Sequence, residues 1–136
     1  MRSLISIVFI PLASLAASPE PNCEKPVTTY DLNICGSQVG EQARAEMQRY
    51  FAVAISRLER EEPQAVKALE DAQAAWQAYS EKHCASVSAR WEGGTIRGPT
   101  TVQCFVSLTR ARTYQLWSEF LTYPDRTPSL LPEPKR

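Results

Sequence analysis

The chain has 136 residues, of which 43% are hydrophobic, and this is enough for one domain with a core but not for two ordinary domains. Fifteen basic residues balance fifteen acidic ones, so the sequence lacks the basic excess typical of nucleic-acid-binding proteins. A charged fraction of 22% also excludes the highly charged composition of a disordered chain. The composition therefore predicts one small folded module.

Residues 1–18 predict an export signal. A positive charge at Arg2 precedes an apolar run over residues 4–15, and small residues at positions 16–18 suit cleavage. The run is shorter than the roughly 20 apolar residues that span a membrane. We therefore expect a bacterial protein that is periplasmic or secreted, with no membrane insertion after the signal is removed. Loss of Arg2 leaves one more acidic than basic residue, a charge too small to steer a partner strongly.

Four cysteines, Cys23, Cys35, Cys84 and Cys104, predict two disulfides, because an even number of cysteines in an oxidising compartment usually pairs. A zinc site would need close cysteine pairs, whereas the nearest spacings here are twelve and twenty residues. We expect no metal and no cofactor. Four cysteines allow three pairings, and the choice depends on the fold.

Long stretches without proline predict helices. Residues 28–62 carry apolar side chains three and four positions apart, which is the spacing of one helix face. Thr28 and Asp31 predict a capping box at the start of this helix. Gly36 and Gly40 weaken the first turns and allow a break just after the second cysteine.

Two further helices follow. Residues 63–91 open with a proline suited to a first helical turn and are rich in good helix formers. Residues 100–123 carry a wide apolar face, with Thr100 as the predicted cap. No stretch alternates in the manner of a half-buried strand. The sequence predicts an all-α fold, a three-helix antiparallel up-down-up bundle within residues 19–123, followed by a proline-rich loose tail over residues 124–136.

The predicted bundle selects one cysteine pairing. At 1.5 Å per residue, Cys84 lies about 10 Å from the end of its helix and Cys104 about 6 Å from the start of the next. The two cysteines are nearly level, so we expect a Cys84–Cys104 disulfide between the second and third helices. The other disulfide, Cys23–Cys35, would tie the N-terminal strap to the first helix.

Several motifs occur in order with this cysteine spacing. They are Cys23, Thr28-x-x-Asp31-Leu32-Asn33-x-Cys35-Gly36, Leu69-x-x-Ala72-Gln73-x-x-Trp76-x-x-Tyr79-x-Glu81-x-x-Cys84, Gly93-Gly94-Thr95 and Cys104-x-x-x-Leu108-Thr109-x-x-Arg112-x-x-x-Leu116. The set resembles the lysozyme-inhibitor LprI N-terminal domain family from Cys23 to about Leu121. The resemblance implies an exported bacterial helical domain, and the family name implies inhibition of lysozyme.

The resemblance also implies structural roles for motif residues. Arg112 is expected to form an ion pair across the bundle, with Asp31 and Glu81 as candidate partners. The family usually has Arg-Asp at the positions held here by Ser80 and Glu81, so this chain lacks the arginine at that place. The motif residues given a structural role are Thr28, Asp31, Asn33, Gln73, Trp76 and Arg112.

The glycine-rich connection over residues 92–99 is the candidate partner-binding segment. Held at its base by a disulfide, it could enter a cleft, and Arg97 could bond to the two carboxylates with which a lysozyme cleft works. The simpler interpretation is that the glycines only supply positive φ angles and that Arg97 is solvated. Trp91, beside the loop, is the candidate exposed anchor. The residues proposed to contact a partner are Trp91, Glu92, Thr95 and Arg97.

The sequence contains no serine-nucleophile elbow, zinc-protease helix motif or phosphate loop, so we expect no catalytic residues and no enzyme activity. The predicted function is an exported binding protein that inhibits lysozyme or another muramidase by steric and polar blocking of the active-site cleft. The alternative is a periplasmic interaction or scaffold module whose partner is an envelope protein.

Overall fold

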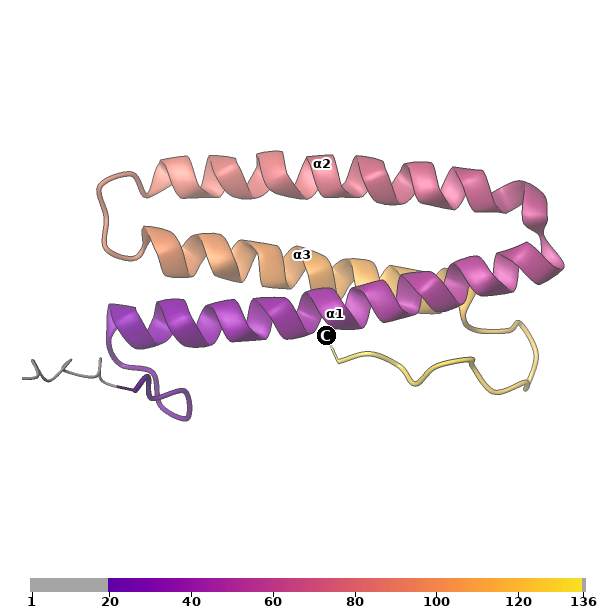
Figure 1. The fold of residues 1–136 in the computed structure, drawn as a ribbon, viewed down its shortest axis with the longest axis horizontal. Helices are drawn as coiled ribbons and strands as arrows, with labels where there is room; N and C mark the ends of the chain where they lie inside the picture. Colours follow the sequence, from indigo (N-terminus) through magenta and orange to yellow (C-terminus); the bar gives the residue numbers. More distant parts are fainter. Residues whose placement is uncertain (1–19, 136) are drawn as a thin grey trace, which may run out of the picture.

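The computed structural model describes residues 20–135, which form an antiparallel bundle of three long helices (Figure 1). The first helix, α1, spans Thr29–Glu61 and leads through a short 3-10 turn, η1 (Pro63–Ala65), into α2 (Val66–Arg90). The third helix, α3, spans Arg97–Phe120. The described residues contain no strand, and the predicted all-α up-down-up bundle is confirmed. The predicted signal at residues 1–18 lies outside the described part, in which no helix is long and apolar enough to cross a membrane.

The helix α3 organises the core. It packs along α1 and also against α2, whereas α1 and α2 contact each other only weakly and lie apart over most of their length (Figure 1). Tyr50 of α1 and Leu116 of α3 are 1% and 0% exposed, so large side chains from both helices are buried in the seam between them. The buried core cluster consists of Met47, Tyr50, Ala54, Leu58, Leu69, Leu116 and Leu121.

The helix α1 begins as predicted but is not broken at Gly36. Its N-cap is Thr28, whose hydroxyl accepts the Asp31 N–H in a complete capping box. A side chain at Gly36 would start 3.2 Å from a methyl group of Val102 on α3. The glycine therefore allows α1 and α3 to approach closely, and that packing compensates for its low helix propensity. The break that the two glycines allowed does not occur.

The helix α3 begins three residues earlier than predicted, at Arg97 instead of Thr100. Pro99 lies in its first turn, where a missing N–H removes no intrahelical hydrogen bond. Thr100 does not cap the helix, because its hydroxyl donates back to the carbonyl of Ile96. The predicted loop is thus shorter, and Arg97 belongs to α3.

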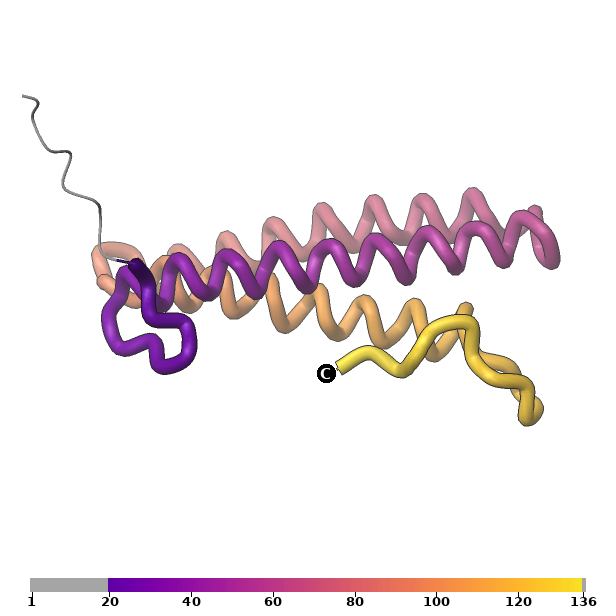
Figure 2. Tube along the Cα trace, turned by 60° about the horizontal axis from the view of Figure 1, so that its bottom comes forward, coloured from indigo at the N-terminus to yellow at the C-terminus, as the bar shows by residue number. Residues whose placement is uncertain are grey.

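The segment predicted as a loose tail folds back onto the bundle (Figure 2). The Tyr50 hydroxyl donates to the Pro132 carbonyl at 2.6 Å, and the Trp117 indole N–H donates to the Leu131 carbonyl at 3.0 Å. The side chain of Leu131 also packs against the core cluster. The tail therefore docks, and the expectation is corrected. Extended proline-rich backbone leaves its carbonyls free to accept, and aromatic donors on α1 and α3 meet them.

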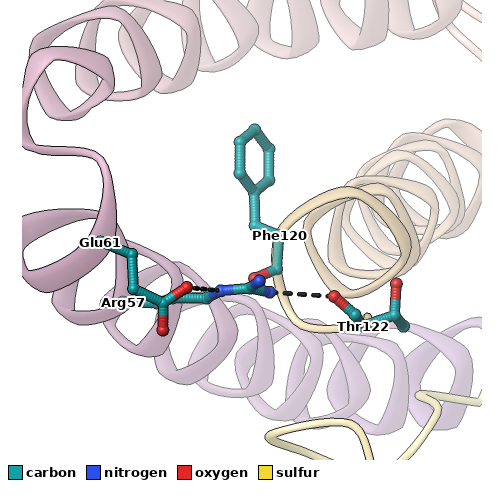
Figure 3. Close-up of polar contacts among 4 residues, drawn as sticks. All are labelled: Arg57, Glu61, Phe120 and Thr122. Atoms are coloured by element: carbon teal, nitrogen blue, oxygen red, sulfur yellow. Dashed lines mark hydrogen bonds and ion pairs between the residues drawn. The ribbon is translucent and has the colours of Figure 1, made fainter. Parts of the chain in front are cut away.

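Arg57 of α1 closes the C-terminal end of α3 (Figure 3). Its guanidinium Nη1 donates to the carbonyls of Phe120 and Thr122 at 2.8 and 2.9 Å, and Nε pairs with Glu61 at 2.8 Å. The same group lies 4.2 Å from the ring centroid of Tyr123. A cation at a helix C-terminus satisfies carbonyls that have no intrahelical donor.

Replacing Arg57 with Ala should lower the free energy of unfolding by about 2 kcal/mol, because two carbonyls lose a charged donor. Urea unfolding of the variant measures this loss. Arg60→Ala is the matched control, since Arg60 is exposed on the same turn of α1, and it should change stability by less than about 0.5 kcal/mol. Equal losses in both variants would contradict the capping role.

Candidate functional site

Both disulfides lie toward one end of the bundle. Cys23–Cys35 ties the N-terminal strap to α1 with a Cα separation of 5.4 Å, and Cys84–Cys104 ties α2 to α3 with a separation of 5.7 Å. Both predicted pairings are confirmed. Figure 1 places the strap and the α2–α3 loop at the same end. We call residues 20–34 together with residues 88–98 the disulfide end.

A buried carboxylate fastens the strap. Asp31 is 8% exposed, and its Oδ2 accepts the Thr28 hydroxyl at 2.7 Å and the Thr28 N–H at 3.1 Å. Its Oδ1 accepts the Asn22 N–H at 3.0 Å. These hydrogen bonds, the Thr28 side chain first, lower the pKa of Asp31 from its ordinary value of 3.8. The ionised carboxylate therefore holds the strap against the start of α1.

The loop between α2 and α3 is held by its own backbone. The Gly94 N–H donates to the Trp91 carbonyl at 3.0 Å, and the Arg97 N–H donates to the Gly94 carbonyl at 3.2 Å. Gly93 has a φ of 79°, in the left-handed region that favours glycine. Successive turns and a nearby disulfide thus brace the loop.

The four residues proposed to contact a partner all lie at the disulfide end, but their neighbours differ. Trp91 is 38% exposed, with the Arg90 guanidinium 5.9 Å from its ring centroid. Glu92 and Thr95 are exposed on the loop. Arg97 is exposed on the first turn of α3, and its Nε donates to the Ser88 hydroxyl of α2 at 2.8 Å. Arg97 therefore also links the ends of α2 and α3.

Asn33 explains another glycine. A Cβ added at Gly98 would lie 2.4 Å from the Asn33 amide oxygen. A side chain at residue 98 would therefore require the Asn33 amide to move. Asn33, expected to be structural, lies at this contact between the two helices.

Arg112 makes a different contact from the predicted one. Its Nε donates to the Gln73 amide oxygen at 3.0 Å, and the Gln73 amide nitrogen lies 3.6 Å from the Met47 sulfur. This polar chain joins all three helices, and burial lowers the pKa of Arg112. The predicted ion pair of Arg112 with Asp31 or Glu81 was wrong. Asp31 is hydrogen-bonded to the strap, and Glu81 is exposed on α2.

Trp76 is half-buried and packs against the core cluster, as a core residue should. Among residues 20–135, no three His, Cys, Asp or Glu side chains gather as a metal site would require.

Exposed apolar side chains are concentrated at the disulfide end, and sequence reasoning missed most of them. Val27 of the strap is 76% exposed, Tyr30 of α1 is 45% exposed and Ile96 of the loop is 40% exposed. Helical periodicity identifies the buried stripe of a helix and says little about large apolar residues outside it. The signal that could have indicated this surface was the presence of apolar residues in the N-terminal strap and in the short α2–α3 loop, where no helix face can bury them. A concentration of exposed apolar side chains is typical of surfaces that contact partners. The set comprises Val27, Tyr30, Leu32, Ile34, Trp91 and Ile96.

Comparison with known proteins decides the family. Residues 22–116 match the family described as Lysozyme inhibitor LprI. The chain belongs to the LprI family. It is also 31% identical over 111 residues to an uncharacterized protein of Rhizobium meliloti (strain 1021), in an alignment that covers 74% of this chain and 80% of that protein. No solved structure matches it. The LprI match includes both disulfides and the α2–α3 loop, and it ends before the docked tail.

The Asp31 network makes stability depend on acid. Because the folded pKa is lowered, the stabilisation is complete above the ordinary pKa of 3.8 and is lost as the pH falls through the lowered value. Asp31→Asn should remove this part of the pH dependence, which urea unfolding at a series of acidic pH values measures.

A carbon NMR titration of the wild-type carboxyl should give a pKa below 3.8. Asp71→Asn, which removes an exposed carboxylate on α2, is the control and should retain the Asp31-dependent loss in acid. A wild-type pKa at or above 3.8 would contradict the network.

Proposed function

We propose that this LprI-family protein is an exported inhibitor of lysozyme or another muramidase and that it acts by occupying the active-site cleft. The observation that carries the proposal is the disulfide end, where several exposed apolar side chains lie at the same end of the bundle as a short braced loop. The family description supplies the class of partner. Two disulfides beside an exposed apolar surface are what a rigid binding protein needs in an oxidising compartment.

Rigidity is the main energetic contribution of the scaffold. A flexible loop loses conformational entropy when it binds, and this cost reduces the affinity. Here the loop backbone is bonded to itself, Arg97 is bonded to Ser88, and Cys84–Cys104 fixes the helices on either side. Little further ordering is needed when the loop enters a cleft.

The side chains at this end suit a cleft with two carboxylates. Trp91 and Ile96 supply apolar anchors that exclude water, as energetically dominant interface residues commonly do. The Arg97 guanidinium can donate charged hydrogen bonds to the target carboxylates. Glu92 offers a carboxylate to basic groups at the rim of the cleft.

The proposed action forms no bond. All four cysteines are in disulfides, so no thiol remains as a nucleophile. Inhibition would then depend on the amount of folded, oxidised protein, and reduction would weaken it by releasing the strap and the helix pair.

A cell-wall lysis assay with purified, oxidised mature protein tests the proposal, and protection should increase with dose. Trp91→Ala and Ile96→Ala should each raise the concentration for half inhibition by about tenfold, since each removes a buried anchor from the interface. The control is Tyr79→Ala, which removes an even more exposed aromatic side chain about 18 Å along α2 from Trp91 and should leave inhibition unchanged.

Three further outcomes separate the alternatives. Unchanged inhibition by Arg97→Ala would remove the guanidinium from the proposed contact and leave the apolar anchors. Equal losses in the Tyr79 control would exclude the disulfide end as the contact surface. No protection against several types of muramidase would overturn inhibition and favour the scaffold module with an envelope protein partner.

A further inference from the structure

A groove lies between α1 and α2, midway along the bundle. The two helices join at η1 and diverge toward the disulfide end, with α3 beneath the space between them (Figure 1). The groove has a volume of about 510 Å³, within the range of sites for small molecules. It is distinct from the α2–α3 loop, none of whose residues line it.

The groove combines aromatic and polar side chains. Trp76 of α2 and Phe105 of α3 line it together with the buried Met47 and Val106. Three helices contribute to it, so the rings and the polar groups face one space. The polar lining residues are Ser37, Glu41, Arg44, Gln48, Gln77, Ser80, Glu81 and Thr109.

The charges on the rim nearly cancel. Glu41 and Arg44 pair at 3.9 Å, which leaves Glu81 as the lining charge without an ion-pair partner among the described residues. A strongly anionic or cationic ligand would therefore gain little from the rim. A purely apolar ligand would leave the amides and carboxylates of the groove without hydrogen-bond partners. The lining favours a neutral ligand with many hydroxyls and a flat apolar face.

We propose that this groove binds a short neutral oligosaccharide. The C–H face of a sugar ring can pack on the electron-rich faces of Trp76 and Phe105. Its hydroxyls can donate to the carboxylates and bond with the amides of Gln48 and Gln77. This binding site is independent of the proposed inhibition, which uses the disulfide end.

Ser80 keeps the groove open. It is 5% exposed, and its hydroxyl donates to the Gln77 carbonyl of its own helix at 2.8 Å. Ser80 lines the groove, so the guanidinium of an arginine at this position would occupy the space that the sugar needs. Ser80→Arg therefore fills the groove from a position that lines it.

The probe is the β-1,4-linked tetramer of N-acetylglucosamine, titrated into the full mature chain and followed by tryptophan fluorescence and amide NMR. We expect saturable binding with a dissociation constant of order 0.1–1 mM and shifts confined to groove residues. Ser80→Arg should weaken binding at least about tenfold. Ala75→Arg adds the same side chain at an exposed position of α2 outside the groove and should leave binding unchanged.

Gln48→Ala and Gln77→Ala test the groove independently, in case the Ser80 variant does not fold. Both amides are exposed, so each substitution should weaken binding about threefold or more without changing the unfolding midpoint. No saturable binding by the wild type, equal binding by the Ser80 and Ala75 variants, or displacement of the sugar by a short neutral peptide of higher affinity would each overturn the proposal.

Discussion

Close packing of α1 against α3 is the contact on which the other features depend. Gly36 permits this approach beneath Val102, and Gly98 lies beside the Asn33 side chain at the start of α3. The seam takes most of the large buried side chains, so α2 contributes only a small apolar surface. Its buried residues are Leu69, Gln73, Ser80 and Cys84.

Because α2 buries so little apolar area, covalent and polar links hold it in place. The Cys84–Cys104 disulfide fixes it near the loop, and the contact of Gln73 with Arg112 fixes it midway. Between these attachments the groove lies between α2 and α1. The same disulfide braces the α2–α3 loop, so one covalent link supports both proposed binding surfaces.

Local chemistry made much of this structure predictable from the sequence. The capping box at Thr28, the helix types and both disulfides followed from residue spacing and from the level positions of the cysteines. Contacts between distant segments did not follow. Arg112 has many candidate partners in a sequence with fifteen acidic residues, and its partner is an amide. The exposed apolar surface at the disulfide end was missed for a related reason, since periodicity describes each helix alone.

The tail shows how an extended segment becomes part of such a bundle. Its backbone cannot form a helix around the prolines, so its carbonyls need donors from elsewhere. Tyr50 and Trp117 supply them from α1 and α3, and Arg57 holds the carbonyls at the turn that leads into the tail. The tail lies beyond the residues that match the LprI family, whereas both proposed surfaces lie within them. It follows that the tail covers the seam on which the bundle depends without forming part of either proposed surface.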